Sequence, residues 1–325
     1  MAVYDPRGGG DVHVDEVLTN ISVGYQNESF ISEQLAPAVP VRKQTDKYRI
    51  FGKEGWVLEP GDDYRAPGAE ANEIPGLTVS TDTYFCQEHA LRIAVTDEER
   101  ENADSPLAPD RDGTELVTDK ILLQRELRVR DLVYATGNYP AGSVVTLAGT
   151  DQWNDYANSD PIGDYKTGRD VIHSQLFMHP TKTVVPYQVM STLEDHTDFI
   201  ERIKYSQAGV LTPEIVARVM GSAQFIVPGA GYNSANMGQA ESLAYIWGKN
   251  VLMAYVPPRA GMRIPAFMYE FVWKKGGRDQ VTTRWRAESR GADVIQVARR
   301  YDHKFIAKDA SNDSLAGYLI VNAIA

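Results

Sequence analysis

The chain has 325 residues, of which 43% are hydrophobic and 24% are charged, as is ordinary for a globular protein of one or two domains. Its formal net charge of −11 argues against a general nucleic-acid-binding protein, because such proteins normally carry an excess of basic residues. A single cysteine, Cys86, excludes an intramolecular disulfide and a cysteine metal cluster, and it favours a reducing environment.

Nothing in the sequence indicates export or membrane insertion. Residues 1–10 end in three glycines and are expected to be disordered, and the N-terminal segment lacks the apolar core of a signal peptide. A long run without charge, residues 220–240, is interrupted by Gln, Asn, Ser, Pro and Gly. We therefore expect no membrane span.

The first third of the chain is expected to contain short helices and a long ribbon. Residues 11–35 predict one or two short helices that end before Pro37 and Pro40. Residues 41–58 and 77–95 are rich in strand-forming residues. Between these runs lies a segment rich in Gly, Pro and acidic residues. The simplest arrangement is a two-stranded ribbon whose tip has no core of its own.

The clearest helix is predicted over residues 114–136, after a charged connection at residues 96–110. Leu116, Leu123 and Leu127 belong to an apolar stripe at helical spacing, and a Gly-Asn pair follows as a C-terminal stop. At about 1.5 Å per residue this helix would be roughly 34 Å long, which is long for a compact domain.

Alternating helices and strands follow a polar loop at residues 139–168, a pattern typical of an α/β region. Helices are expected at residues 168–178, 189–205 and 212–220, with strands at 181–187 and 223–227. The remainder is expected to be strands, at residues 242–256, 266–274, 292–310 and 317–324.

No catalytic or metal-binding signature is complete. None of the six histidines has the spacing that would place two imidazoles on one helix face, and there is no G-x-S-x-G elbow. Residues 163–170 have the glycines of a phosphate loop without its Lys-Ser/Thr, and residues 229–234 lack the third glycine of a dinucleotide fingerprint. We expect a loop and a turn there, and Cys86 as a buried structural thiol. No catalytic residue, cofactor or metal is predicted.

Charge is unevenly distributed along the chain. Residues 54–101 carry 12 acidic residues against three arginines, and residues 259–304 carry 11 basic residues against five acidic ones. Such a distribution would suit two surfaces that meet between subunits. Two separately solvated faces would have the same composition.

The order of these parts resembles the major capsid proteins of tailed bacteriophages, which have the Hong Kong 97 type fold. Residues 20–56 (NISVGYQNESFISEQLAPAVPVRKQTDKYRIFGKEGW) resemble the arm that leads into the extended loop of that family. Residues 149–156 (GTDQWNDY), followed by DPIGD, resemble the connection after its long helix. Residues 244–252 (AYIWGKNVL), followed by AYVPPRAG, resemble the strand that leaves its central region. The similarity covers nearly the whole chain.

The resemblance implies an α+β fold with a long spine helix in a peripheral domain and an α/β axial domain. The expected parts are an N-terminal arm (1–45), an extended two-stranded loop (46–96), a peripheral domain with the spine helix (97–149), an axial domain (150–262) and returning strands of the peripheral domain (263–325).

The resemblance also implies a structural protein rather than an enzyme. Copies of the chain would assemble as hexamers and pentamers into an icosahedral shell around the double-stranded DNA of a tailed phage, assembled in the bacterial cytoplasm and found in the virion. The ribbon would lie on a neighbouring subunit, which would explain why it has no core. Candidate inter-subunit contacts are Lys53, Trp56, Asp62, Asp63, Arg65, Arg284, Arg286 and Arg290.

Further partners follow from the same resemblance. Separate scaffolding and portal proteins are expected, a decoration protein is left open, and contact with packaged DNA should be weak and non-specific because the chain is acidic. Some relatives carry a cleaved scaffolding segment, whereas here the arm begins near residue 11. Some relatives also crosslink a lysine to an asparagine; Lys53 and Asn312 have these residue types, but we do not predict a crosslink.

Three alternatives remain open. An encapsulin-like compartment would share the fold but hold protein cargo, and its genomic neighbours would include a cargo enzyme instead of portal and terminase genes. A soluble α/β enzyme would need a convergent polar pocket. A decoration protein would be compact and would lack the long helix and the three-part order.

Overall fold

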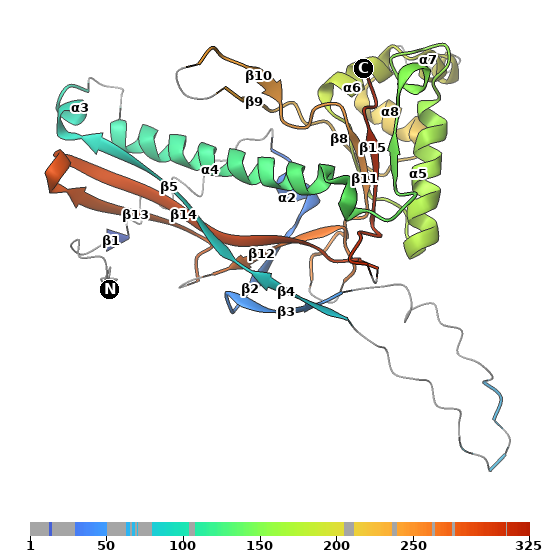
Figure 1. Cartoon of the computed structure of the whole chain (residues 1–325), viewed down its shortest axis with the longest axis horizontal. Coiled ribbons are helices and arrows are strands. Elements are labelled where there is room, and N and C mark those ends of the chain that lie inside the picture. The colour runs from blue at the N-terminus through green and yellow to red at the C-terminus, as the bar shows by residue number, and fades with distance from the viewer. Residues whose placement is uncertain are drawn as a thin grey trace.

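The molecule is elongated, and its described residues form two larger β-sheets and two two-stranded ones, as the computed structural model in Figure 1 shows. A long helix lies along the first sheet, and shorter helices surround the second sheet at the other end. The expected α+β class is therefore confirmed. The structure describes residues 13–14, 30–50, 63–65, 67–68, 70, 80–103, 108–204, 211–235, 239–261, 264–274, 277–309 and 311–325.

The first sheet is built around the long strand β14. This strand pairs with β13 and then with β12 on one side, and with β5 along ten residues on the other. All of these pairs are antiparallel, and β2 joins β12 in parallel. The strands are β1 (His13–Val14), β2 (Ala38–Val41), β5 (Gln87–Thr96), β12 (Met268–Trp273), β13 (Gln280–Ala287) and β14 (Ala292–Phe305).

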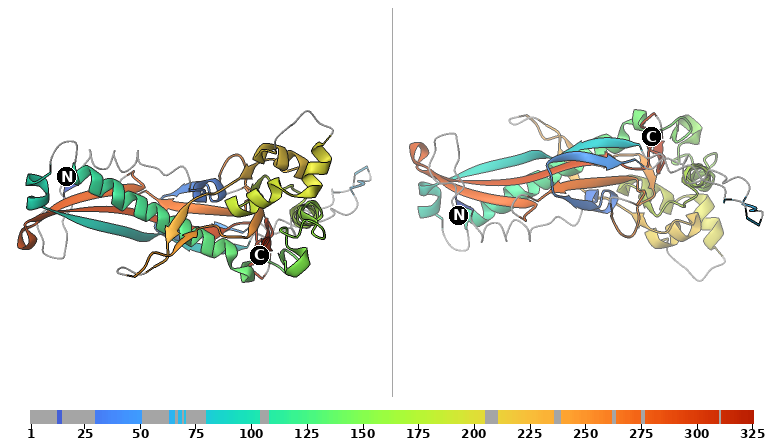
Figure 2. Two further views of the ribbon diagram at one scale, coloured as in Figure 1. Left: turned by 90° about the horizontal axis from the view of Figure 1, so that it is seen from above. Right: turned by 90° about the horizontal axis from the view of Figure 1, so that it is seen from below.

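Helix α4 (Pro109–Tyr134) is the predicted spine helix, and it covers one face of this sheet. Figure 2 shows the helix across the strands from above and the uncovered strands from below. Val117 and Ile121 pack against Ile93 of β5 and Val297 of β14. The predicted stripe is partly wrong, because Leu116 is half exposed. The buried face includes charged residues, which obscure its apolar periodicity.

The predicted connection at residues 96–110 contains a short helix, α3 (Asp97–Glu101). The Thr96 hydroxyl accepts a hydrogen bond from the Glu99 N–H, and the Glu99 carboxylate accepts one from the Thr96 N–H. This capping box, T-x-x-E, was a readable signal for a helix start.

The second sheet has the order β6-β15-β11-β7-β8. Its strands are β6 (Val144–Thr146), β7 (Lys182–Val184), β8 (Phe225–Ile226), β11 (Val251–Ala254) and β15 (Gly317–Val321). Helices α5 (Pro161–Leu176), α6 (Tyr187–Glu194), α7 (Thr197–Ile203) and α8 (Pro213–Met220) accompany it. Buried residues from the sheet and all four helices form one apolar cluster.

Some local expectations are corrected. Residues 163–170, expected as a loop, lie in α5, which begins at Pro161 and is capped by the Asp160 carboxylate. The helix expected at 189–205 is two helices, interrupted at Asp195 and His196. His13–Val14 form a strand, not a helix, and of residues 30–35 only Ser32–Leu35 (α2) are helical. Single 3-10 turns lie at Thr136–Asn138, Gly149–Asp151 and Glu288–Arg290.

Two hairpins project from the sheets. The first, β3 (Thr45–Arg49) with β4 (Thr81–Phe85), is the antiparallel base of the predicted ribbon. Much of the ribbon beyond it lies outside the described residues. The second, β9 (Gly231–Asn233) with β10 (Leu243–Tyr245), includes part of the expected turn at residues 229–234.

The chain passes from the first sheet to the second sheet between its last two strands. β14 and β15 follow each other in the chain, yet β14 lies in the first sheet and β15 pairs with β11 and β6 in the second. The boundaries of the expected domains remain a prediction. In the described part of the chain, no helix has the length and apolar character needed to span a bilayer.

Candidate functional site

The base of the ribbon is held on the first sheet by a polar cluster under two aromatic rings. The Tyr48 hydroxyl donates to the Asp82 carboxylate at 2.9 Å, and the Lys308 ammonium lies 3.2 Å from the same oxygen. The Tyr84 ring stacks on Phe271 with centroids 4.7 Å apart. Because both β3 and β4 contribute, the base of the ribbon has a defined orientation on the first sheet.

The electrostatics of this cluster favour the ion pair. Burial alone would raise the pKa of Asp82, but hydrogen bonds from the Thr83 N–H, Tyr48 and Lys308 outweigh it and lower that pKa. Burial and the neighbouring Asp82 carboxylate raise the pKa of Tyr48, so its hydroxyl stays protonated and donates. Lysine, aspartate and tyrosine therefore act here as a structural anchor.

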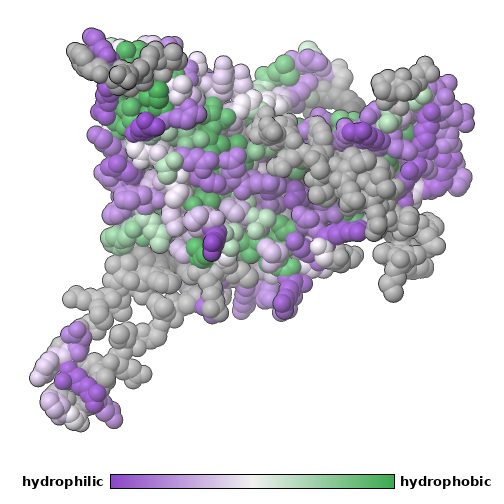
Figure 3. Space-filling view, turned by 180° about the vertical axis from the view of Figure 1, so that it is seen from behind, coloured by the Kyte–Doolittle hydropathy of each residue, from purple (hydrophilic) through white to green (hydrophobic). Residues whose placement is uncertain are grey.

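Opposite charges gather at the far end of the first sheet, which Figure 3 shows as mainly hydrophilic. Three arginines and three aspartates form what we call the arginine–aspartate cluster: Arg100, Arg284, Arg286, Asp97, Asp110 and Asp293. Distances between paired N and O atoms include 2.6 Å for Arg284–Asp293, 2.5 Å for Arg286–Asp97 and 2.9 Å for Arg100–Asp293. Hydrogen bonding to Arg286 lowers the pKa of Asp97.

Some of the acidic and basic residues that are unevenly distributed along the sequence pair with each other within one chain. Arg286 and Asp97, and likewise Arg300 and Glu88 at 2.9 Å, join the basic and acidic segments within one chain. Of the other predicted contact residues, Asp63, Arg65 and Arg290 are exposed. Lys53, Trp56 and Asp62 lie outside the described residues. Whether any of these residues touches another copy stays a prediction.

Two consecutive charged residues of α4 hold the N-terminal arm. Glu126 is fully buried, and its carboxylate accepts hydrogen bonds from the backbone N–H groups of Ile31 and Ser32 at 3.0 and 2.9 Å. It also accepts one from the Trp247 indole at 2.7 Å. Its neighbour Arg125 binds Glu33 at 2.6 Å and the buried Glu270 at 2.5 Å. Sequence reasoning missed this clamp.

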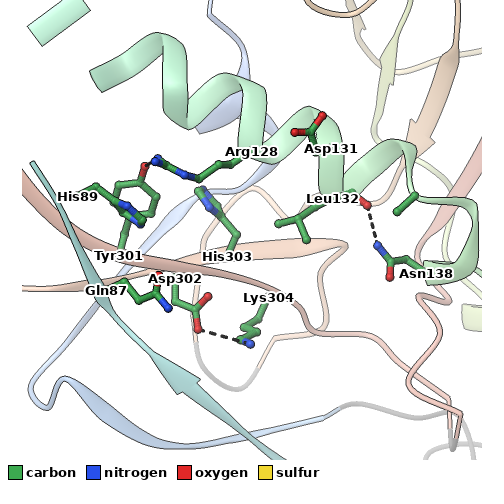
Figure 4. Close-up of a pocket in the computed structure, with 11 residues that line it drawn as sticks. Gln87, His89, Arg128, Asp131, Leu132, Asn138, Tyr301, Asp302, His303 and Lys304 are labelled. Atoms are coloured by element: carbon green, nitrogen blue, oxygen red, sulfur yellow. Dashed lines mark hydrogen bonds and ion pairs between the residues drawn. The ribbon is translucent and has the colours of Figure 1, made fainter. Parts of the chain in front are cut away.

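A pocket of about 590 Å³ lies between α4 and strands β5 and β14 (Figure 4). Its lining residues are Gln87, His89, Arg128, Asp131, Leu132, Ala135, Asn138, Tyr301, Asp302, His303 and Lys304. Arg128 donates to the Tyr301 hydroxyl at 2.6 Å, and Asp302 accepts from the Phe85 N–H at 2.9 Å. Burial lowers the pKa of His303 to about 4, so this imidazole is neutral at pH 7.

One arrangement around the buried His196 has the residue types of a hydrolytic triad but the wrong proton positions. Ser159 Oγ lies 3.1 Å from His196 Nε2, and Asp198 follows two residues later. The Asp198 backbone N–H donates to His196 Nδ1, so the proton of the neutral ring is on Nε2. Ser159 donates to the Asp155 carbonyl. The imidazole therefore caps α7 and cannot accept a proton from the serine.

Cys86 is buried, as expected from the sequence. Its thiol donates to the Phe271 carbonyl with S and O 3.3 Å apart. Burial raises the pKa of this thiol to about 12, so the nucleophilic thiolate is scarcely populated at neutral pH. The geometry supports a packing role under the ribbon base.

Comparisons with known proteins found similar structures and similar sequences. No protein-family model matches the chain. The structure resembles that of a phage-related protein from Bordetella bronchiseptica, with a TM-score of 0.73 and 23% identity, over 96% of this chain and 98% of that one. It also shares its fold with the mature capsid of bacteriophage PhiM1, with a TM-score of 0.55 and 14% identity, over 98% of this chain and 92% of that one.

The comparison of sequences identifies the family, which the shared fold alone does not. A major capsid protein of Burkholderia phage BcepMu is 31% identical over 274 residues, which cover 83% of this chain and 86% of the relative. The Hong Kong 97 type fold expected from the sequence is confirmed by these neighbours. The chain belongs to the family of major capsid proteins of tailed bacteriophages.

Proposed function

We propose that copies of this chain associate as hexamers and pentamers and close into the icosahedral shell around the double-stranded DNA of a tailed phage. The observation that carries this proposal is the base of the predicted ribbon, formed by β3 and β4. This base is anchored, yet among the described residues β3 and β4 pair only with each other. An isolated two-stranded ribbon is marginally stable in water, so a neighbouring copy is the natural packing partner.

The acidic part of the ribbon is proposed to lie on basic residues of the next copy. Asp62, Asp63 and Arg65 would contribute from the ribbon, together with Lys53 and Trp56. Arg290 would receive them. Arg284 and Arg286, also predicted contacts, already neutralise aspartates of their own chain. We therefore expect them to contribute through the field of the arginine–aspartate cluster more than through new ion pairs.

The remaining partners are proposed because the chain belongs to this family of capsid proteins. Assembly in the host bacterial cytoplasm would involve separate scaffolding and portal proteins. A net charge of −11 disfavours tight binding of packaged DNA, because each phosphate neutralised by a basic residue would add affinity. The proposed parts are those set out above: arm, extended loop, peripheral domain, axial domain and returning strands.

The direct test is negative-stain electron microscopy and mass determination of the chain expressed alone and with its genomic neighbours. Closed shells or rings of hexamer size are the expected result. A 36.1 kDa monomer under both conditions would contradict the proposal. Particles that contain protein cargo and no DNA in an infected host would instead favour the compartment alternative.

Charge reversal at Asp62 and Asp63 tests the ribbon contact. The Asp62→Lys/Asp63→Lys variant should fold as the wild type does and give a lower yield of particles. A matched control, Asp151→Lys/Asp170→Lys, changes the net charge equally at exposed positions of the second-sheet region. Wild-type particle yield from the first variant would rule out the contact.

A further inference from the structure

The β9–β10 hairpin exposes large apolar side chains. Figure 1 shows it projecting from the second sheet above α4, and in the described part of the chain its strands pair only with each other. Leu243 is 78% exposed, and Tyr245 is less so. Tyr187, at the start of α6, is 56% exposed, and its ring centroid lies 6.3 Å from that of Tyr245. We call these three residues the hairpin patch.

The hairpin is attached to the body and is ordered by its own hydrogen bonds. The Tyr232 ring lies under the Arg130 guanidinium at 5.6 Å, and its hydroxyl accepts from Arg130 at 3.3 Å. The Asn233 side chain accepts from the backbone N–H of Ala235 and Ser242, both at 3.0 Å. The exposure of the hairpin patch is therefore a property of a defined surface.

The sequence around the hairpin is depleted of charge. Residues 219–248 contain one charged residue, Glu241, although the chain as a whole is 24% charged. A hairpin that stays in water normally carries charged residues, which prevent unwanted pairing. The centres of protein interfaces, by contrast, are depleted of charge and enriched in tyrosine. This composition favours a hairpin that another protein surface covers.

A second apolar patch lies across the same domain. Ile200 of α7 is 45% exposed, and Tyr156, which packs against the N-cap residue of that helix, is 40% exposed. The Tyr156 carbonyl accepts from the Thr197 hydroxyl at 3.0 Å, and its ring packs edge-on against His196 at 5.6 Å. We call Tyr156 and Ile200 the α7 patch. In Figure 1, α7 and the hairpin lie on opposite sides of the second sheet.

We propose that the hairpin patch of one copy seats on the α7 patch of a second copy. The contact joins two different surfaces on opposite sides of one domain, so it is heterologous, and repetition closes it into a ring when the rotation between copies fits. Both patches present an aromatic and an aliphatic side chain, which supply the apolar centre that such an interface needs. This inference rests on the proposed assembly function and names one of its contacts.

Crosslinking between the two patches tests the contact directly. The native Cys86 is buried, so cysteines introduced by Leu243→Cys and Ile200→Cys would be the reactive thiols. Assembled particles of the double variant, treated with a short bismaleimide, should give a ladder of covalent oligomers on a denaturing gel. Each single variant should remain monomeric on the gel. A double variant that assembles but gives no ladder would overturn the contact.

A polar substitution provides a second readout. Leu243→Asp should lower the yield of particles by at least tenfold, while the unassembled chain keeps the wild-type unfolding temperature. Leu116→Asp, at a 50% exposed leucine on α4, is the control and should assemble normally. Wild-type yield from Leu243→Asp would refute the inference. If the wild type itself formed no particles, the proposed function would fail; particles without the ladder would overturn this contact alone.

Discussion

Two neighbouring residues of α4 carry the buried charges that organise the centre of the molecule. Arg125 and Glu126 face different partners, since one binds carboxylates and the other binds N–H groups of α2 and the Trp247 indole. A buried carboxylate that accepts several hydrogen bonds is stabilised by them, whereas loss of the carboxylate leaves the donors without partners. The clamp thus ties the arm to the spine helix.

We expect Glu126→Ala to be strongly destabilising. Each buried donor left unpaired costs about 1–3 kcal/mol, and Glu126 serves Ile31, Ser32 and Trp247, so the total should be at least about 3 kcal/mol. Urea unfolding followed by circular dichroism measures the change. Glu115→Ala, which removes a surface carboxylate paired with Arg111, is the control and should change stability by less than about 1 kcal/mol. Equal effects of the two changes would contradict the clamp.

His303 should make folding stability depend on pH. Burial lowers its pKa from 6.5 to about 4 in the folded chain. Below pH 6.5 the unfolded chain therefore binds a proton that the folded chain does not bind, and stability falls as the pH decreases toward 4. The full effect is about 3 kcal/mol.

Unfolding free energies measured between pH 7 and 4 would test this expectation. The His303→Gln variant should show a shallower fall than the wild type over this range. Burial also lowers the pKa of His89, which lines the same pocket, so part of the slope should remain in the variant. Parallel curves for the two proteins would show that His303 does not titrate as stated.

Helix α5 shows how one glycine sets the packing of an element. A Cβ added at Gly168 would lie 1.9 Å from Met253 Cε and 2.6 Å from Tyr318 Cδ1, so the helix rests directly on β11 and β15. In the sequence this glycine is one of the two glycines of an incomplete phosphate-loop pattern. Its role in the structure is steric, because only a residue without a side chain permits this distance between helix and sheet.

Gly168→Ala should therefore destabilise the chain by about 1–3 kcal/mol, because overpacking outweighs the gain of about 1 kcal/mol in helix propensity. Gly137→Ala is the matched control, since no atom lies within 4 Å of the added Cβ. Thermal unfolding of both variants measures the difference. A Gly168→Ala protein as stable as the control would mean that Met253 and Tyr318 move aside freely.

At the scale of the whole molecule, the folded body and the ribbon should be separable. Replacing residues 51–79 by an Asn-Gly turn would join Ile50 to Ser80, whose backbone N–H and carbonyl already pair at 2.9 Å. The shortened chain should unfold at the wild-type temperature, because the base is anchored by Tyr48, Asp82 and Lys308. It should form no closed shells in electron micrographs. Shells of normal size would show that the ribbon is dispensable for assembly.

Much of the architecture was predictable because it depends on local pattern. The spine helix, the base of the ribbon and the strands β7, β11, β12 and β14 follow from periodicity and propensity. The break between α6 and α7 could not be predicted from the local pattern. The side chain of His196 caps α7 only after the chain has turned. The clamp residues Arg125 and Glu126 were missed, because charged residues in an amphipathic helix are normally assigned to its solvent-exposed face.

By itself the sequence determined the kind of protein: it predicts a long helix and an acidic ribbon without a core, lacks a complete catalytic signature and contains the phrases of a capsid family. Only the tertiary structure decided which charges meet, since Asp97 and Arg286 are distant in sequence and become neighbours through β5, β14 and β13. It likewise decided which face of α4 is buried and that β15 returns to the second sheet. Propensity and periodicity act within a few residues, whereas ion pairing and strand pairing depend on distances that only the complete fold establishes.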